Sequence, residues 1–224
     1  MRDISEFINK IHCCDCLDLM REMPDKCVDL VLTDPPYGIG DKLCNGGNIN
    51  GNNVMQKLYW ATEWEDVAPK QEYFDEIVRI SKNQIIFGGN YFNLPPTRGF
   101  IVWDKIKFSD RHSQVEYIWT SFDCISRIFK YCSNGGFVIK PEDRHEHPTQ
   151  KPLALMKWIL EKYSDEGMTV LDPFLGSGTT AVACKKLGRN YIGIEKEPAY
   201  VEIALKRLEK VNNHKITDFF GVDE

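Results

Sequence analysis

Long apolar runs are missing from this 224-residue sequence. No window approaches the roughly 18 consecutive apolar residues that a membrane-spanning helix needs. The N-terminal stretch MRDISEFINK mixes charges with isolated apolar side chains and does not form the apolar segment of a secretory signal. The sequence therefore predicts a soluble, cytoplasmic protein with no membrane partner.

An excess of positive charge is also missing, since 28 Lys and Arg face 33 Asp and Glu, for a net charge of −5. This balance argues against strong nonspecific affinity for nucleic acid, but a protein that contacts phosphates needs to be basic on one face only. A local nucleic-acid groove and an ordinary mixed-charge surface both remain open. Basic side chains are concentrated in the middle of the chain, at positions 98, 105, 107, 111, 127, 130, 140 and 144.

The eight cysteines lack the partners that a disulfide framework or a metal site requires. Disulfide frameworks belong to short secreted chains, so we expect reduced thiols here. Cys13, Cys14 and Cys16 lie near His12, yet no second Cys-x-x-Cys or His-x-x-x-His arm is available to complete a tetrahedral zinc site. We predict small apolar residues near a strand end, and no metal.

Strand-like and helix-like patterns alternate along the chain, which predicts an α/β fold with a doubly wound, mainly parallel sheet in a single domain over residues 1–224. The irregular stretch 38–68 is too long for an ordinary connection and is typical of a functional or disordered loop. Strands are expected at 10–14, 28–33, 84–87, 168–171 and 190–194, helices at 69–81, 151–163, 179–187 and from 198, and an antiparallel or mixed edge from short runs at 100–103, 115–120, 125–131 and 136–139.

The first candidate site follows the strand predicted at 28–33. Its apolar residues indicate burial on both faces, and Asp34-Pro35-Pro36-Tyr37 comes directly after it. Ligands of open α/β sheets bind at the carboxyl ends of the strands, so this quartet is placed for chemistry. A rigid turn with a surface tyrosine is the alternative.

A glycine loop follows the strand predicted at 168–171. Gly176, Gly178 and Ala181 have the spacing that permits a tight turn and close approach of a ligand, and Glu195 ends the next strand, where it can accept both hydroxyls of a ribose. This order of features predicts a nucleoside cofactor; a purely structural turn is the alternative. The hydroxyls of Ser177, Thr179 and Thr180 suit a pyrophosphate, but Asp172 at the loop entrance favours a cation nearby, as in S-adenosylmethionine.

Three sequence blocks occur in an order that resembles the amino-group DNA methyltransferases of the β arrangement, in which the catalytic motif precedes the cofactor motif. With the strands around them they cover nearly the whole chain. The resemblance implies a Rossmann-like methyltransferase sheet, DNA as partner and S-adenosylmethionine as methyl donor. The blocks are Asp34-Pro35-Pro36-Tyr37, His147-Pro148-Thr149-Gln150-Lys151-Pro152 and Asp172-Pro173-Phe174-Leu175-Gly176-Ser177-Gly178.

The resemblance also implies which residues form the two sites. Phe174, Gly176 and Ser177 would line the cofactor pocket with Glu195 on the ribose, and family members usually carry an acid at the position of Asp15, although its neighbour, commonly glycine, is Cys14 here. The predicted catalytic residues are Asp34, Pro35, Pro36 and Tyr37. The predicted cofactor residues are Asp15, Asp34, His147, Lys151, Asp172, Phe174, Gly176, Ser177, Gly178, Thr179 and Glu195.

The chemistry of an exocyclic amine accounts for the first block. Its nitrogen is a poor nucleophile because the lone pair is delocalised into the base. Hydrogen bonds to the Asp34 carboxylate and the Pro35 carbonyl draw it towards tetrahedral geometry, and the prolines keep these acceptors rigid. Tyr37 offers a flat face to a base swung out of the duplex, and direct transfer from the sulfonium follows.

Adenine is the expected target, because cytosine enzymes of the family more often begin this motif with Ser; amino-group methylation of cytosine is the alternative. A nucleotide-dependent oxidoreductase leaves the first two blocks without roles, and a non-catalytic nucleic-acid binder would not need Asp34. Methyltransferases that act on protein glutamine use a similar catalytic turn, Asn-Pro-Pro-Tyr, but it follows their cofactor loop. In this sequence the order is the reverse. Target recognition is expected from residues 121–146, the loop 38–68, or a second subunit, since dimers are common in the family.

Overall fold

One mixed sheet runs through the part of the chain that this computed structural model describes, residues 2–39, 67–106, 113–132 and 150–217. Its eight strands have the order β1-β8-β7-β2-β3-β5-β4-β6. The first five strands in this order are mutually parallel. They are β1 (Lys10–Cys13), β8 (Asn190–Glu195), β7 (Thr169–Asp172), β2 (Val28–Thr33) and β3 (Ser81–Phe87).

The remaining strands form the mixed edge that the short β-like runs predict. β5 (Val115–Thr120) is antiparallel to both β3 and β4 (Phe100–Asp104), and β6 (Arg127–Lys130) is parallel to β4. The described part of the 121–146 region thus includes an edge strand of the sheet. The run predicted at 136–139 lies outside the described residues.

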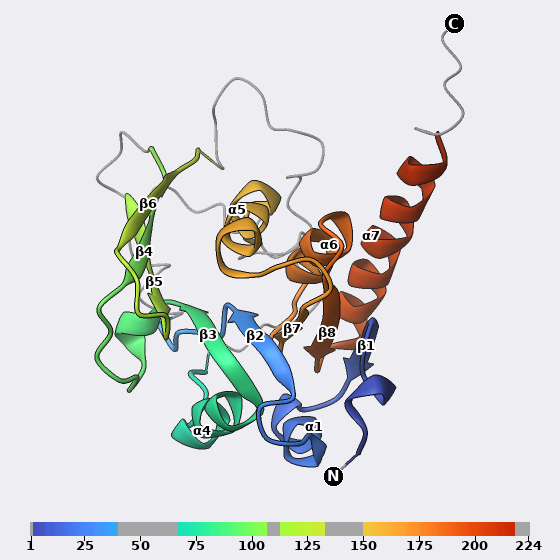
Figure 1. The fold of residues 1–224 in the computed structure, drawn as a ribbon, viewed down its shortest axis with the longest axis horizontal. Helices are drawn as coiled ribbons and strands as arrows, with labels where there is room; N and C mark the ends of the chain where they lie inside the picture. The colour runs from blue at the N-terminus through green and yellow to red at the C-terminus, as the bar shows by residue number, and fades with distance from the viewer. Residues whose placement is uncertain (1, 40–66, 107–112, 133–149, 218–224) are drawn as a thin grey trace, which may run out of the picture.

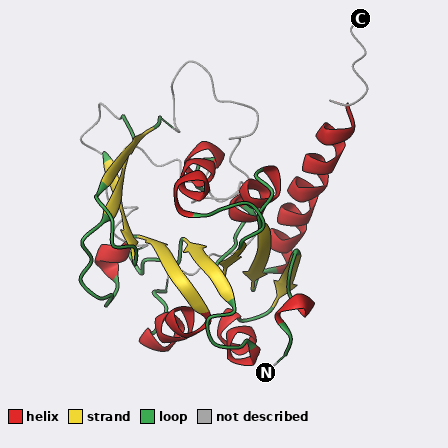
Figure 2. Ribbon diagram, viewed as in Figure 1, coloured by secondary structure: helices red, strands yellow, loops and turns green. Residues whose placement is uncertain are grey.

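Helices cover both faces of the sheet (Figures 1 and 2). α1 (Cys16–Glu22) and α4 (Gln71–Ile80) lie on one face. α5 (Leu153–Tyr163), α6 (Thr179–Lys186) and α7 (Pro198–Thr217) lie on the other, and short 3-10 turns occur at η1 (Ile4–Glu6) and η2 (Gly89–Tyr91). The predicted α/β, doubly wound, mainly parallel sheet is therefore confirmed.

Two apolar cores follow from the alternation of side chains along the buried strands. On β3, Ile85 and Phe87 pack in the core beneath α5, α6 and α7, whereas Ile86 packs in the core beneath α1 and α4. Phe74 and Ile77 of α4 complete that second core. Because both faces are covered, the central strands carry nearly continuous apolar runs, which is why they were readable from the sequence.

The strand order reverses between β2 and β7. From β2 the chain continues to β3 on one side, and from β7 it continues to β8 on the other. Ligands of doubly wound sheets bind at the carboxyl ends of the strands at such a reversal. The residues that follow β2 and β7 are those of the two predicted site loops.

Helix α1 is absent from the elements that the sequence predicts. The Asp15 carboxylate accepts a hydrogen bond from the Leu17 N–H at 2.8 Å and so caps this helix. An acid followed by apolar residues at 17, 19 and 20 is the signal that could have revealed it. Elsewhere the boundaries shift by a few residues: α4 begins at Gln71, after the predicted 69, and β3 begins at Ser81, before the predicted 84.

Most of the loop predicted at 38–68 lies outside the described residues, as does His147. No helix in the described ranges is both long enough and apolar enough to cross a bilayer.

Candidate active site

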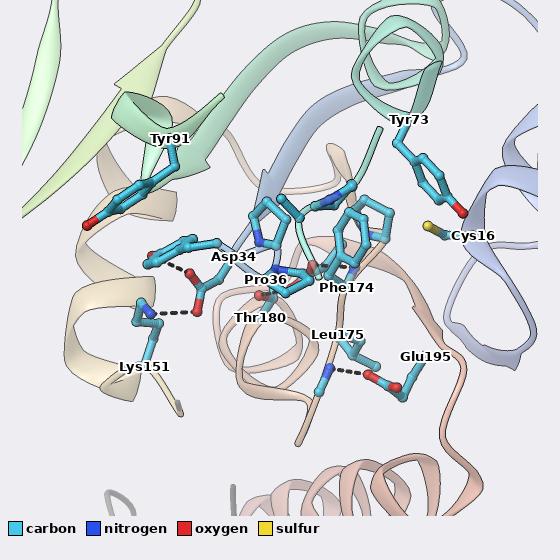
Figure 3. A pocket seen from close by; sticks show the side chains of 18 of the residues that line it. Cys16, Asp34, Pro36, Tyr73, Tyr91, Lys151, Phe174, Leu175, Thr180 and Glu195 are labelled. Carbon is cyan, nitrogen blue, oxygen red and sulfur yellow. Dashed lines mark hydrogen bonds and ion pairs between the residues drawn. The ribbon is translucent and has the colours of Figure 1, made fainter. Parts of the chain in front are cut away.

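The two predicted site loops leave the sheet side by side. Strands β2 and β7 pair directly, with Val31 opposite Leu171. At their carboxyl ends the Thr33 hydroxyl donates a hydrogen bond to Asp172 Oδ1 at 2.7 Å, which ties one strand end to the other. The Asp34 loop and the glycine loop therefore face the same space (Figure 3).

Asp34 is held by two partners on its two carboxylate oxygens. Lys151 Nζ lies 2.5 Å from Oδ2, and the Tyr37 hydroxyl donates to Oδ1 at 2.7 Å. The Asp34 side chain is only 17% exposed and that of Lys151 only 9%. The predicted cofactor residue Lys151 thus reaches the predicted catalytic carboxylate in this structure.

Burial and neighbouring charges act against each other at this pair. Burial raises the pKa of the Asp34 carboxyl, the Lys151 ammonium opposes that rise, and the Glu116 carboxylate adds to it. Burial by itself lowers the pKa of Lys151, but the carboxylates of Asp34 and Glu116 outweigh burial and raise it. Lys151 therefore stays charged beside Asp34.

Tyr37 is part of an aromatic group on the β3 side of the site. Its ring stacks on that of Tyr91, with centroids 4.9 Å apart and planes 19° from parallel, and Phe92 meets it edge-on. Gly88 has a left-handed backbone with φ +63°, and a side chain there would clash with the Tyr37 ring. The absence of a side chain at position 88 thus determines where Tyr37 lies.

The glycine loop is fastened to the end of β8. Gly176, with φ +53°, donates its N–H to Glu195 Oε2 at 2.8 Å, and the Glu197 N–H donates to Oε1 at 2.9 Å. Burial raises the pKa of the Glu195 carboxyl, and these N–H donors oppose the rise. Each carboxylate oxygen has two lone pairs, so both can still accept a ligand hydroxyl.

The hydroxyls of the glycine loop are occupied by protein partners. Arg207 of α7 donates through Nη1 to the Ser177 carbonyl and hydroxyl oxygens at 2.7 and 2.8 Å, and to Thr179 Oγ1 at 3.0 Å. The Ser177 hydroxyl in turn donates to Gln150 Oε1 at 3.0 Å. These bonds fix the loop to α7 and to the segment that precedes α5.

Asp172 has a structural task in addition to its place beside the site. The Thr180 hydroxyl donates to Oδ2 at 2.6 Å, the Phe174 N–H donates to Oδ1 at 3.1 Å, and Thr33 donates as described above. Burial raises the pKa of this carboxyl to about 6, and these three donors oppose the rise. With both oxygens engaged by the protein, Asp172 braces the two strand ends.

Asp15 and Phe174 line the same cavity as Asp34, and both contact Tyr73. The Tyr73 hydroxyl of α4 donates to Asp15 Oδ2 at 3.1 Å, and the Tyr73 ring lies 6.2 Å from that of Phe174. Asp15 therefore caps α1 with one oxygen and meets Tyr73 with the other. An apolar ring and an exposed carboxylate lie next to each other in this part of the cavity.

Most of these residues line one cavity of about 800 Å³, within the usual range of roughly 300–1,000 Å³ for ligand sites. Gly178 does not line it and packs against Ala204 of α7 instead. Its φ is +85°, and a Cβ added at this position would lie only 2.6 Å from the Ala204 Cβ. The predicted residues that do line it are Asp15, Asp34, Pro35, Pro36, Tyr37, Lys151, Asp172, Phe174, Gly176, Ser177, Thr179 and Glu195.

Sequence reasoning missed several residues of this site. Glu116 and Tyr91 line the cavity, Tyr73 supports Asp15, and Arg207 holds the glycine loop. The signal for Glu116 was present, since it is the only charged residue in the strand Val-Glu-Tyr-Ile-Trp-Thr. No comparable local signal marks Arg207, because its contact depends on how α7 packs.

Known proteins share both the sequence pattern and the fold. Residues 102–206 match the model of the N6/N4 methyltransferase family, described as DNA methylase. The chain is 28% identical to the type II methyltransferase M.HinfI of Haemophilus influenzae, over 93% of this chain and 70% of that protein. It is also 28% identical to the type II methyltransferase M2.DpnII of Streptococcus pneumoniae, over 88% of each. The crystal structure of the M1.HpyAVI–SAM complex has a TM-score of 0.53 at 24% identity, over 89% of this chain and 98% of that one, and supports the fold.

Proposed function

The chain belongs to the amino-group DNA methyltransferases, and from this premise we propose that it transfers the methyl group of S-adenosylmethionine to the exocyclic amine of adenine in DNA. One observation carries the proposal. Asp34 and the Gly176 loop, which are far apart in the chain, lie at neighbouring strand ends and line the same cavity. An amine acceptor and a cofactor loop are thereby brought face to face.

The cavity fits S-adenosylmethionine by its donor and acceptor chemistry. This cofactor carries an ammonium, a sulfonium and ribose hydroxyls, but no phosphate. The wall correspondingly offers the carboxylates of Asp15 and Glu195, an aromatic ring at Phe174, and the open backbone of Gly176. The hydroxyls of Ser177 and Thr180, which would suit a pyrophosphate, already donate their protons to Gln150 and Asp172.

S-adenosylmethionine supplies an electrophilic methyl group when it is bound. The task of the protein is to hold an amine in line with that group, and proximity and orientation of this kind contribute much of an enzyme's rate. The Asp34 carboxylate accepts a hydrogen bond from the amine and takes the proton that the nitrogen loses. The Pro35 carbonyl accepts the second hydrogen bond, and Pro36 keeps the turn rigid.

Tyr37 and Tyr91 provide an aromatic surface beside Asp34. Tyr91 is 47% exposed and lines the cavity, so the stacked pair continues from the buried carboxylate to the solvent. A base inside a duplex cannot reach Asp34, so the target must leave the stack before it reacts. We assign Tyr37 as the ring on which the extruded base lies.

Target choice and assembly belong to the same proposal. Adenine is favoured over cytosine because the catalytic motif begins with Asp34. DNA recognition is assigned to residues 38–68 and 121–146, or to a second copy of the chain in a homodimer. The assigned location is the cytoplasm. We assign all 224 residues to one methyltransferase domain.

The proposal is tested by incubating the protein with methyl-labelled S-adenosylmethionine and unmethylated DNA, then digesting the DNA and identifying the labelled base by mass spectrometry. We expect N6-methyladenine at one sequence context. Label on the amino group of cytosine alone would overturn the choice of base, and label on RNA but not DNA would overturn the choice of substrate. Absence of label from every nucleic acid would contradict the activity itself.

A further inference from the structure

Glu116 is a buried acid beside the catalytic pair that the reaction described above does not use. It projects from β5 with a side chain that is 19% exposed. Its Oε1 lies 2.6 Å from Lys105 Nζ, and its Oε2 lies 3.5 Å from Lys151 Nζ. Oε2 is shielded from solvent and has no hydrogen-bond partner in the described part of the chain.

The four side chains form a string of alternating charge, in the order Lys105, Glu116, Lys151 and Asp34. The Lys105 side chain is 13% exposed, so most of the string is removed from water. Taking charges out of water costs about as much as their mutual attraction returns, and apolar substitutes are often at least as stable. A gain in stability therefore does not explain why these four charged side chains are placed together.

Asp34 is influenced by groups from every element packed around it. Among the described residues these are Tyr37 on its own loop, Lys151 ahead of α5, Glu116 on β5 and Asp172 at the end of β7. Lys105, after β4, acts through Glu116. The negative charge of Glu116 favours the protonated form of Asp34, and the positive charge of Lys105 counteracts it.

We propose that Glu116 and Lys105 are positioning residues for methyl transfer, which balance the charge of the Lys151–Asp34 pair. The negative charge of Glu116 offsets part of the effect that the Lys151 ammonium has on Asp34. The Asp34 carboxylate therefore stays basic enough to take a proton. Lys105 limits this effect so that Asp34 remains ionised before transfer. The inference rests on the proposed function, since it assigns a use to the basicity of Asp34.

The proton balance of the reaction explains the need for this arrangement. As the nitrogen–carbon bond forms, the sulfur–carbon bond breaks with its electron pair on sulfur, and the nitrogen becomes cationic. It then releases one proton to Asp34. A carboxylate paired only with a lysine would be a weaker base for that proton.

The test is a titration of the Asp34 carboxyl by carbon-13 NMR in the protein without cofactor, with the signal assigned by its loss in Asp34→Asn. Glu116→Gln should move the Asp34 midpoint to lower pH by about one unit, and Lys105→Met should move it to higher pH by a similar amount. The double variant should return it to near the wild-type value. The acid limb of the single-turnover pH–rate profile should shift in the same directions.

Three controls separate this role from a structural one. Glu116→Asp keeps the charge and should keep the midpoint, Glu161→Gln on the exposed surface of α5 should change nothing, and thermal unfolding checks that each variant folds. Shifts in the same direction for Glu116→Gln and Lys105→Met, or no shift in either, would overturn the inference. If Asp34→Ala abolishes transfer while the midpoints stay fixed, only this inference fails; if Asp34→Ala keeps transfer, the proposed function fails with it.

Discussion

Single backbone positions determine the geometry of this site as much as charged side chains do. Gly88 and Gly167 both have left-handed backbones, with φ of +63° and +81°. A side chain at position 88 would clash with the Tyr37 ring, whereas a side chain at position 167 would meet nothing within 4 Å. The two glycines therefore separate the effect of backbone strain from the effect on Tyr37.

We predict that Gly167→Ala lowers the free energy of unfolding by about 1–2 kcal/mol, the cost of a left-handed non-glycine residue, and that Gly88→Ala lowers it by at least as much because of the added clash. Only Gly88→Ala should also reduce methyl transfer, by roughly 100-fold, because it displaces the Tyr37 ring on which we propose that the base lies. Urea denaturation and single-turnover transfer measure the two effects. Equal transfer rates in both variants would show that the position of Tyr37 is unimportant.

At the scale of elements, α7 holds the glycine loop in place. Arg207 donates to Ser177 and Thr179 from the buried side of the helix, while its neighbour Lys206 only pairs with Glu202 at the surface, 2.6 Å away. Hydrogen bonds from a charged group contribute about 1.5–3 kcal/mol, whereas exposed ion pairs contribute little. The two positions thus form a matched comparison on one helix.

Arg207→Met should lower the free energy of unfolding by about 1.5–3 kcal/mol and weaken the binding of S-adenosylmethionine roughly tenfold, because the loop is no longer ordered in advance. Lys206→Met should leave both quantities close to wild type. Calorimetry for binding and chemical denaturation for stability provide the measurements. Wild-type cofactor affinity in Arg207→Met would contradict the role given to α7.

Elements with a strong local pattern were predictable, and those fixed by tertiary contacts were not. The central strands and α5, α6 and α7 follow from apolar periodicity, since both faces of the sheet are covered. The seven-residue helix α1 was missed because its signal is a single capping acid, Asp15, ahead of a short apolar stripe. The meeting of Lys151 with Asp34 was also missed, because it depends on how the segment before α5 crosses the strand ends.

At the scale of the whole molecule, the order of the sequence blocks predicted which loops meet, but not how their charges are distributed. The neighbouring ends of β2 and β7 follow from a doubly wound topology. The sequence predicts Asp172 near a cofactor cation, and the structure adds that its oxygens accept hydrogen bonds from Thr33, Thr180 and the Phe174 N–H. Such burial cannot be seen in a motif, and it gives the whole protein a pH dependence.

Asp172 should make stability fall as pH rises from about 4 to 6. Burial raises its pKa from 3.8 to about 6, so the folded state binds a proton that the unfolded state has lost in this window. The contribution of the bound proton to the free energy of unfolding is fully present below pH 3.8. Above pH 6 it is lost, and the protein is then less stable by about 3 kcal/mol. Relative to wild type, Asp172→Asn should therefore gain about 1–2 kcal/mol in unfolding free energy between pH 5 and pH 8. A difference independent of pH would show that Asp172 is ionised throughout.

The most direct test of the account is the rate of one methyl transfer in Asp34→Ala, measured with cofactor bound beforehand and compared with Asp75→Ala on the exposed surface of α4. We predict a loss of about 10²–10⁴-fold in Asp34→Ala, with the affinity for S-adenosylmethionine within a few-fold of wild type, and no loss in Asp75→Ala. Transfer by Asp34→Ala at the wild-type rate would contradict the claim that this carboxylate holds the target amine.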